Sequence, residues 1–254
     1  MNNKENSSTR SAVVTGASSG IGQATVRALR DQGWTVFAVA RRADRLEELA
    51  QLTGAIALPA DVSVQNDVDE LTKAVEAAGG VDTLVNCAGG ARGTEYWADA
   101  VDENWEFMWQ ANVMGTMRLT RALLPQLRQT RGTVLNVTST AALASYEGGS
   151  GYNAAKAAER AMTQALRLEE VENGLRVIEI LPGLVQTEEF SLRRLGSQSA
   201  ADSVYAGVES PLTAEDVAEV IRYAVSAPAH VNLDEIVIRP QAQAANHKLI
   251  RNAK

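Results

Sequence analysis

The sequence predicts an α/β fold in which about seven parallel strands form one doubly wound sheet with helices on both faces. Short β-rich runs alternate with longer helical stretches from one end of the chain to the other. Several of the short runs are continuously apolar, as expected of parallel strands that are covered on both faces. No long linker rich in proline, glycine or serine interrupts the alternation, so the 254 residues are expected to form one domain.

The expected strands comprise residues 12–15, 35–40, 55–58, 83–86, 133–138, 176–181 and 235–239. The expected helices comprise residues 20–32, 43–51, 64–78, 103–127 and 152–173. In the third of these helices, Val68, Leu71 and Val75 recur at the spacing of one helix face. Thr213 followed by Asp216 is typical of a capped helix start, which predicts a further helix that runs to Ser226.

Three segments fall outside this alternation. Residues 1–9 are polar and lack the apolar region of a signal peptide, so we expect a disordered N-terminal tail. The domain itself is expected over residues 10–240, followed by a C-terminal tail over residues 241–254. Residues 188–211 are too many for a simple connection, and a loop of that length is usually either a functional lid or disordered.

Composition and charge exclude several classes of function. The net charge of −7 leaves no basic excess for nucleic acid or an anionic membrane surface, so neither is an expected partner. No run of residues approaches the apolar length needed to span a membrane. Cys87 is the one cysteine and cannot form an intrachain disulfide, which fits a cytoplasmic protein. We expect no metal site.

A glycine-rich turn follows the first expected strand. It reads Thr15-Gly16-Ala17-Ser18-Ser19-Gly20-Ile21-Gly22 and runs directly into a helix. A diphosphate needs a tight turn, close approach of the backbone and free N–H groups at a helix N-terminus. Glycines suit this task because no Cβ blocks the anion, and the two serine hydroxyls can add donors. The turn therefore predicts a dinucleotide site formed by Gly16, Ser18, Ser19, Gly20, Ile21 and Gly22.

Further motifs follow this turn along the chain. Asn86-Cys87-Ala88-Gly89 comes after the fourth expected strand, and Pro182-Gly183-Leu184-Val185-Gln186-Thr187 comes after the sixth. Ser139, Tyr152 and Lys156 lie between them. In this order the motifs resemble those of the short-chain dehydrogenase/reductase family, over about residues 10–240. The resemblance implies a Rossmann-type fold and an oxidoreductase that transfers a hydride between a nicotinamide cofactor and a small alcohol or ketone.

Cys87 stands where the family has a second asparagine. The simplest interpretation is that it packs as a small buried hydrophobic residue. A catalytic thiol is the alternative, although no histidine lies near it in the sequence.

The residues after the second expected strand predict which dinucleotide is bound. An acidic residue near the end of this strand would hold the ribose 2′-OH of NAD, but Ala40 stands there, and Arg41 and Arg42 follow. Cationic donors suit the 2′-phosphate of NADP(H), so the pair predicts that cofactor. The alternative is a solvated basic start to the next helix, which the helix dipole would oppose.

The family resemblance implies additional cofactor contacts. Asp61, with Val62 beside it, resembles the residue that binds the adenine amino group, and the alternative for Asp61 is the N-cap of the helix near Val64. Thr187 would bind the nicotinamide carboxamide. The remaining implied contacts are Asn86, Ala88, Gly89, Tyr152, Lys156, Pro182, Gly183 and Val185.

The chemistry is expected to depend on Tyr152, Lys156 and Ser139. Tyr152 and Lys156 are four residues apart and share one helix face. Reduction of a carbonyl needs a proton donor at its oxygen. A lysine cation, with the further positive charge of an oxidised nicotinamide, should lower a tyrosine pKa of about 10 by about two units. Ser139 can hold the substrate oxygen in line. Taken singly, the pair could be a surface contact and Ser139 a strand-end cap.

The resemblance also implies a role for Asn112, whose backbone in the family helps to hold a water beside the lysine. The alternative for Asn112 is a buried polar residue that is satisfied locally. The two long helices over residues 103–127 and 152–173 pair with symmetry mates in the family, so we expect a homotetramer.

Within the family, the chain resembles bacterial NADP-dependent 3-hydroxy acid (serine-type) dehydrogenases most, on residues 40–46, 182–185, 189–190 and 228–232. Related reductases of small ketones and aldehydes share much of this pattern. Arg92, Arg193 and Arg194 could bind a substrate carboxylate, although exposed arginines are more often solvated than ligands. The alternative function is a catalytically idle regulator that senses NADP, which would be expected to lack Tyr152 or Lys156.

Overall fold

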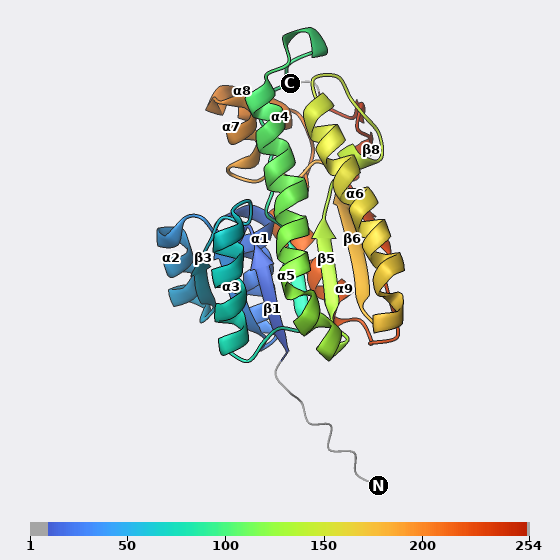
Figure 1. Ribbon diagram of the computed structural model, residues 1–254. Coiled ribbons are helices and arrows are strands. Elements are labelled where there is room, and N and C mark those ends of the chain that lie inside the picture. Colours follow the sequence, from blue (N-terminus) through green and yellow to red (C-terminus); the bar gives the residue numbers. More distant parts are fainter. Residues whose placement is uncertain (1–9, 253–254) are drawn as a thin grey trace.

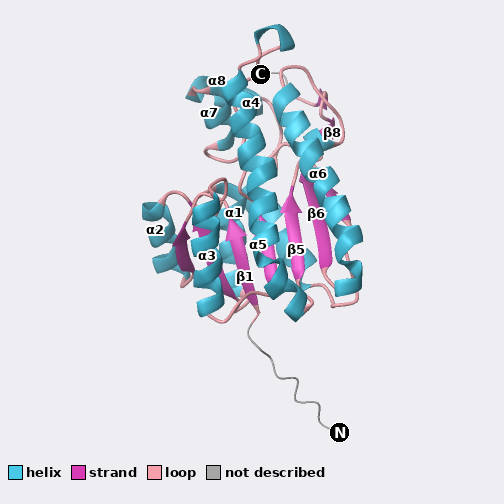
Figure 2. Ribbon diagram, viewed as in Figure 1, coloured by secondary structure: helices cyan, strands magenta, loops and turns pink. Residues whose placement is uncertain are grey.

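The fold was established from a computed structural model that describes residues 10–252, so the predicted N-terminal tail over residues 1–9 lies outside the described residues. Seven parallel strands form one sheet in the order β3-β2-β1-β4-β5-β6-β7, which confirms the predicted doubly wound fold (Figures 1 and 2). The strands are β1 Ser11–Thr15, β2 Thr35–Ala40, β3 Ile56–Pro59, β4 Thr83–Asn86, β5 Thr133–Val137, β6 Arg176–Pro182 and β7 Glu235–Ile238.

Helices cover both faces of the sheet, and each face has its own apolar core. On one face lie α1 (Gly20–Asp31), α2 (Ala43–Thr53) and α9 (Ala214–Ser226). On the other lie α3 (Gln65–Ala77), α5 (Gly115–Thr130) and α6 (Ser150–Glu170), which cross the near side of the sheet in Figure 1. Short 3₁₀ turns span Trp97–Asp99, Thr140–Ala142 and Val171–Asn173.

The expected helix over residues 103–127 is divided by a π-helical turn. Helix α4 spans Asp102–Met108, the π-turn spans Trp109–Met114, and α5 begins at Gly115. Asn112 causes the widening: its side-chain amide donates to Met108 O at 2.7 Å and to Gly90 O at 2.9 Å, and its Oδ1 accepts from Gly90 N at 3.1 Å. The helix therefore deforms to satisfy a loop that lies beside it.

Residues 188–211 are not an irregular loop. They form α7 (Phe190–Leu195) and α8 (Gln198–Tyr205), which lie beyond the carboxyl ends of the strands (Figure 1). The helix that follows starts as predicted, because Thr213 Oγ1 accepts from Asp216 N at 3.2 Å and Asp216 Oδ2 accepts from Thr213 N at 2.8 Å. It ends at Ser226, also as predicted.

The segment over residues 241–254 was expected to be a tail, but much of it folds onto the domain. Strands β8 (Gln243–Ala245) and β9 (Lys248–Leu249) form a small hairpin. Gln243 Oε1 accepts from Leu184 N at 2.8 Å, and Asn246 Nδ2 donates to Thr140 O at 3.0 Å. Side-chain amides thus satisfy the backbone of two loops at the carboxyl end of the sheet.

Between residues 10 and 252, no helix is both long enough and apolar enough to cross a membrane.

Candidate active site

A cavity of about 940 Å³ lies at the carboxyl edge of the sheet, where the connections from β1 and β4 turn to opposite faces. In an open parallel sheet this divergence is where ligands bind. Most of the predicted site residues line the cavity, and Asn86 and Asn112 do not. Those that line it are Gly16, Ser18, Ser19, Gly20, Ile21, Gly22, Arg41, Arg42, Asp61, Val62, Ala88, Gly89, Ser139, Tyr152, Lys156, Pro182, Gly183, Val185 and Thr187.

The glycine turn after β1 has the geometry of an anion cradle. Gly16 adopts a φ of +67°, and a Cβ on Gly22 would lie 2.5 Å from Gly16 O, so neither position accepts a side chain without a shift. Ser19 is the N-cap of α1, and its side chain accepts no hydrogen bond from the described part of the helix. The first N–H groups of α1 therefore remain available, which fits the diphosphate of a dinucleotide.

Thr15 was not predicted as a functional residue, yet it holds this turn in place. Its Oγ1 accepts from Cys87 N at 3.0 Å and from Ala88 N at 2.9 Å. These bonds join the end of β1 to the segment after β4, so both sides of the cradle are fixed to each other. The sequence feature that could have identified Thr15 is a hydroxyl residue at the end of the first expected strand, directly before the glycine turn.

Arg41 and Arg42, which are predicted to select NADP(H), differ in their surroundings. Arg42 makes a two-pronged ion pair with Glu189, with Nη1–Oε1 at 2.6 Å and Nη2–Oε2 at 2.9 Å. Its Nη2 also donates to Ser18 Oγ at 2.9 Å. The Arg41 side chain is 58% exposed and lies 3.7 Å from Asp61, so it is the more available donor at this end of the cavity.

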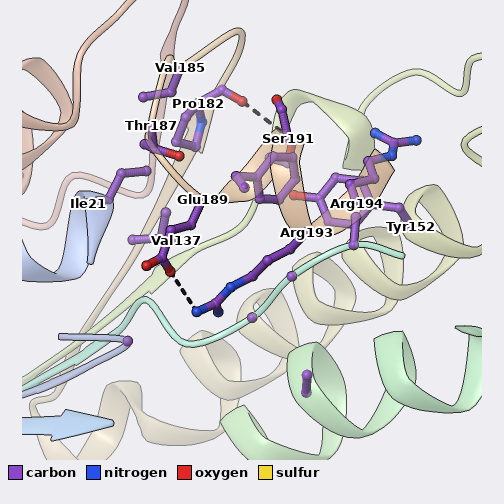
Figure 3. A pocket seen from close by; sticks show the side chains of 18 of the residues that line it. Ile21, Val137, Tyr152, Pro182, Val185, Thr187, Glu189, Ser191, Arg193 and Arg194 are labelled. Atoms are coloured by element: carbon purple, nitrogen blue, oxygen red, sulfur yellow. Dashed lines mark hydrogen bonds and ion pairs between the residues drawn. The ribbon is translucent and has the colours of Figure 1, made fainter. Parts of the chain in front are cut away.

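Glu189 also forms an ion pair with Arg193, whose Nη2 lies 2.6 Å from Glu189 Oε2 (Figure 3). Burial alone would raise the pKa of Glu189, but Arg42 and Arg193 outweigh it and hold this pKa below its ordinary value. No signal in the sequence joined Glu189 to Arg42, because the two are far apart in the chain.

Asp61 lines the cavity and does not cap α3. Its Oδ1 accepts from Ser63 N at 2.9 Å and from Ser63 Oγ at 2.7 Å, which closes a tight turn. The N-cap of α3 is Val64, so the alternative role predicted for Asp61 is wrong.

Asn86 is buried beneath the cavity. Its Nδ2 donates to Asn136 Oδ1 at 2.8 Å and to Thr120 Oγ1 at 3.1 Å. The side chain of Asn86 therefore joins β4, β5 and α5, and a cofactor contact of this residue stays a prediction.

Tyr152, Lys156 and Ser139 meet in the cavity. Tyr152 is 8% exposed, and Phe190 from α7 packs against its ring edge to face, with 5.8 Å between centroids. Ser139 Oγ accepts from Ala141 N at 3.1 Å. Lys156 Nζ donates to Val137 O at 3.0 Å and to Glu159 Oε2 at 2.7 Å. Sequence reasoning missed Glu159, although its spacing of three residues from Lys156 was visible.

Opposing effects act on the pKa of Tyr152. Burial raises the pKa of Tyr152, and this effect exceeds the lowering by the Lys156 cation and by the interaction with Ser139. Lys156 thus acts in the expected sense, but its charge is shared with Glu159, which itself raises the pKa of Tyr152.

Arg194 reaches the cavity from α7, close to Tyr152 (Figure 3). Its guanidinium donates to Tyr146 Oη at 3.0 Å, to Gly148 O at 3.1 Å and to Gly93 O at 3.2 Å. The guanidinium carbon lies 5.8 Å from the centre of the Tyr152 ring. All of these partners are neutral, and within residues 10–252 no carboxylate lies within 4.0 Å of it. Arg92 instead stacks over Phe107, 3.8 Å from the ring centre.

Comparisons with known proteins support the family resemblance of the motifs. A family model described as short chain dehydrogenase matches residues 10–195. An uncharacterized oxidoreductase of Mycobacterium tuberculosis is 53% identical over 238 residues, which cover 93% of each chain. A serine 3-dehydrogenase of Agrobacterium fabrum is 36% identical over 235 residues, covering 91% of this chain and 94% of the relative. A solved serine dehydrogenase, in its closed form with NADP⁺, superposes with a TM-score of 0.90 at 34% identity, covering 96% of this chain and all of that one.

Cys87 provides a prediction about this site. Burial raises the pKa of its thiol to about 12, from an ordinary value of 9.0, against a lowering by Lys156. Only the thiolate is nucleophilic, so at pH 8 the native thiol should react with a disulfide reagent about a thousandfold more slowly than an ordinary one. The measurement is the rate of reaction of the native protein, with the urea-unfolded chain as the control. Cys87 is half-buried and lines the cavity, so rapid reaction of the native protein would contradict the raised thiol pKa and favour the catalytic thiol.

Proposed function

The chain belongs to the short-chain dehydrogenase family, and from that premise we propose that it is an NADP(H)-dependent oxidoreductase of small hydroxy acids, with Tyr152 as acid and base. The observation that carries the proposal is the meeting of Tyr152, Lys156 and Ser139 in the cavity that also contains the glycine turn. Because Tyr152 and Lys156 are both present and line the same cavity as that turn, a catalytically idle regulator is disfavoured.

Different groups of cavity residues would bind different parts of the cofactor. The cradle of Gly16, Ser18, Ser19, Gly20, Ile21 and Gly22 would hold the diphosphate at the N-terminus of α1. Arg41 would pair with a 2′-phosphate, and Asp61 with Val62 would face the adenine. Ala88, Gly89, Pro182, Gly183, Val185 and Thr187 line the remaining wall, where the nicotinamide half would lie. When bound, the nicotinamide supplies or accepts the hydride.

The protein's own residues handle the proton. In reduction Tyr152 donates a proton to the carbonyl oxygen, and in oxidation its phenolate accepts the proton of the alcohol. Ser139 donates to the same substrate oxygen and so orients it. Lys156 stabilises the phenolate by its charge and would bind the ribose of a bound nicotinamide, and Phe190 covers one edge of the Tyr152 ring. Asn112 bonds to Gly90 and widens the helix at this point. The widened turn shapes the cavity wall next to Lys156.

The substrate class follows from Arg194. A cation with neutral partners only, directed into a substrate cavity, favours a ligand with an anionic group. The similar serine 3-dehydrogenase is named for a substrate that carries a carboxylate. We therefore propose a small 3-hydroxy acid or the corresponding oxo acid, with its carboxylate at Arg194 and its hydroxyl at Tyr152.

Cofactor preference tests the assignment of Arg41. Replacing Arg41→Ala removes a charge-assisted phosphate contact, which is worth about 1.5–3 kcal/mol, so affinity for NADP(H) should fall by roughly 10- to 150-fold while that for NAD(H) is spared. The measurement is the Kd of each cofactor by fluorescence titration. Arg45→Ala is the matched control, because Arg45 is a neighbouring arginine outside the cavity lining. Equal kcat/KM for NAD(H) and NADP(H) in the wild type would refute the prediction.

Substrate recognition tests Arg194. Arg194→Gln keeps hydrogen-bond donors but removes the charge, so kcat/KM for a 3-hydroxy acid should fall by roughly 10- to 150-fold. A neutral alcohol of similar size should be affected much less. Arg121→Gln serves as the control, because Arg121 bonds to Gln65 and lies outside the cavity lining. An equal loss on the charged and neutral substrates would rule out a carboxylate contact.

Catalysis tests Tyr152. Tyr152→Phe keeps the packing against Phe190 but removes the transferable proton, so kcat should fall by about 10²- to 10⁴-fold with NADPH binding retained. For the wild type, kcat/KM for oxidation should rise toward alkaline pH, because the base is a phenolate and burial raises the pKa of Tyr152. Steady-state kinetics across the pH range check both statements. A variant that keeps more than about a tenth of the wild-type kcat, with chemistry rate-limiting, would overturn the mechanism.

A further inference from the structure

Glu159 is a buried carboxylate that lies against the catalytic lysine. It follows Lys156 by three residues on α6 and is 0% exposed. Its Oε2 accepts from Lys156 Nζ at 2.7 Å, and its Oε1 accepts from Thr116 Oγ1, in α5, at 3.3 Å. Both carboxylate oxygens of Glu159 therefore accept hydrogen bonds. One of these bonds comes from Lys156, which the proposed function places beside Tyr152.

The ammonium of Lys156 is equally buried. Lys156 is 4% exposed, and its second hydrogen bond goes to the neutral Val137 O at 3.0 Å. Within the described residues, Glu159 is the one carboxylate within 4.0 Å of Nζ. A buried cation is tolerated only when it is paired. Of the three N–H donors of the ammonium, the two contacts use two, which leaves one for a ligand in the cavity.

Other ionisable groups face this pair from each element packed against it. Tyr152 and Cys87 face Lys156, and Tyr146 faces Tyr152. Glu179 faces Glu159 from β6, but it is occupied by Thr138 Oγ1 at 2.6 Å and by Arg160 Nη1 at 3.0 Å. None of these groups is a second counter-ion for Lys156. Removal of Glu159 would therefore leave the Lys156 ammonium without a counter-ion.

We propose that Glu159 is a positioning residue that keeps Lys156 charged and fixed beside Tyr152, so that the lysine can stabilise the phenolate. The inference deepens the proposed function and rests on it. Burial by itself would lower the pKa of Lys156, and Glu159 is the first of the groups that reverse this, giving a raised pKa. Without the carboxylate, Lys156 should lose its proton within the working pH range.

The effect on Tyr152 has a definite sign. Lys156 lowers the pKa of Tyr152 more strongly than Glu159 raises it. If loss of Glu159 neutralises Lys156, the larger influence disappears and the phenolate forms at higher pH. If instead Lys156 stayed charged, only the opposing influence of Glu159 would vanish, and the phenolate would form at lower pH. The two cases are distinguished by the direction of the change.

The main experiment compares Glu159→Gln with the wild type in the full-length enzyme with NADP(H). The glutamine keeps the shape and an oxygen acceptor but carries no charge. We expect kcat/KM for oxidation of a 3-hydroxy acid to acquire a descending alkaline limb, with at least a tenfold loss at pH 9. A profile parallel to that of the wild type, whatever its height, would overturn the proposal.

A second measurement needs no turnover. Phenolate absorbance near 295 nm is followed during a pH titration, as the difference between each protein and its Tyr152→Phe counterpart. The midpoint should move to higher pH in Glu159→Gln, and an unchanged or lower midpoint would overturn the proposal. Because this readout is independent of activity, failure of the proposed function, seen as a wild type without NADP(H)-dependent turnover, is distinguishable from failure of the inference.

Two further variants separate charge from structure. Glu170→Gln removes another buried carboxylate of α6, one that pairs with Arg128 and lies outside the cavity lining, and it should leave both pH profiles unchanged. Glu159→Asp keeps the charge on a shorter side chain, so it should keep the wild-type shape of the profile at a lower kcat. This variant also tests the proposal if Glu159→Gln does not fold, because an alkaline limb in Glu159→Asp would contradict it.

Discussion

The requirement that Lys156 be both buried and charged organises the site. Its ammonium is bonded to Val137 O and to the Glu159 carboxylate. Val137 is the last residue of β5, so the first of these bonds fixes α6 against the carboxyl edge of the sheet. Tyr152 lies one turn earlier on the same helix face, and anchoring Lys156 therefore also determines where the phenol lies. The position of α6 is thus set by a polar contact as well as by apolar packing.

A chain of buried polar bonds continues this alignment into the sheet. Asn86 in β4 donates to Asn136 in β5 at 2.8 Å, and Asn136 donates to Thr163 in α6 at 2.8 Å. Thr163 Oγ1 in turn donates to the backbone oxygen of Glu159 at 2.8 Å. Because buried amides must be paired, a shift of either strand or of the helix would leave several groups unsatisfied. This chain of hydrogen bonds therefore fixes the turn of α6 that carries the Lys156–Glu159 ion pair.

Features with local causes were predictable from the sequence. Alternating patterns located all seven strands of the main sheet to within a residue or two, and Thr213 with Asp216 located the start of α9. The glycine turn was equally readable, because its conformation depends on its own residues. The π-turn was not, since it follows from bonds between Asn112 and Gly90 across two elements. The same limit applies to Arg42, whose partner Glu189 is 147 residues away.

The strap formed by Glu189 and α7 joins the two ends of the cavity. Glu189 binds Arg42 at the cofactor end, Phe190 packs on Tyr152, and Arg194 reaches the loops at the far side. A helix as short as α7 has little stability of its own, so these contacts determine its position. The Arg42–Glu189 pair is bidentate, and 30% of the Arg42 side chain and 17% of the Glu189 side chain are accessible. Phe190 also packs against the apolar cluster that contains Tyr152, Met108 and Ala141, so α7 is held over the catalytic residues by apolar packing as well as by ion pairs.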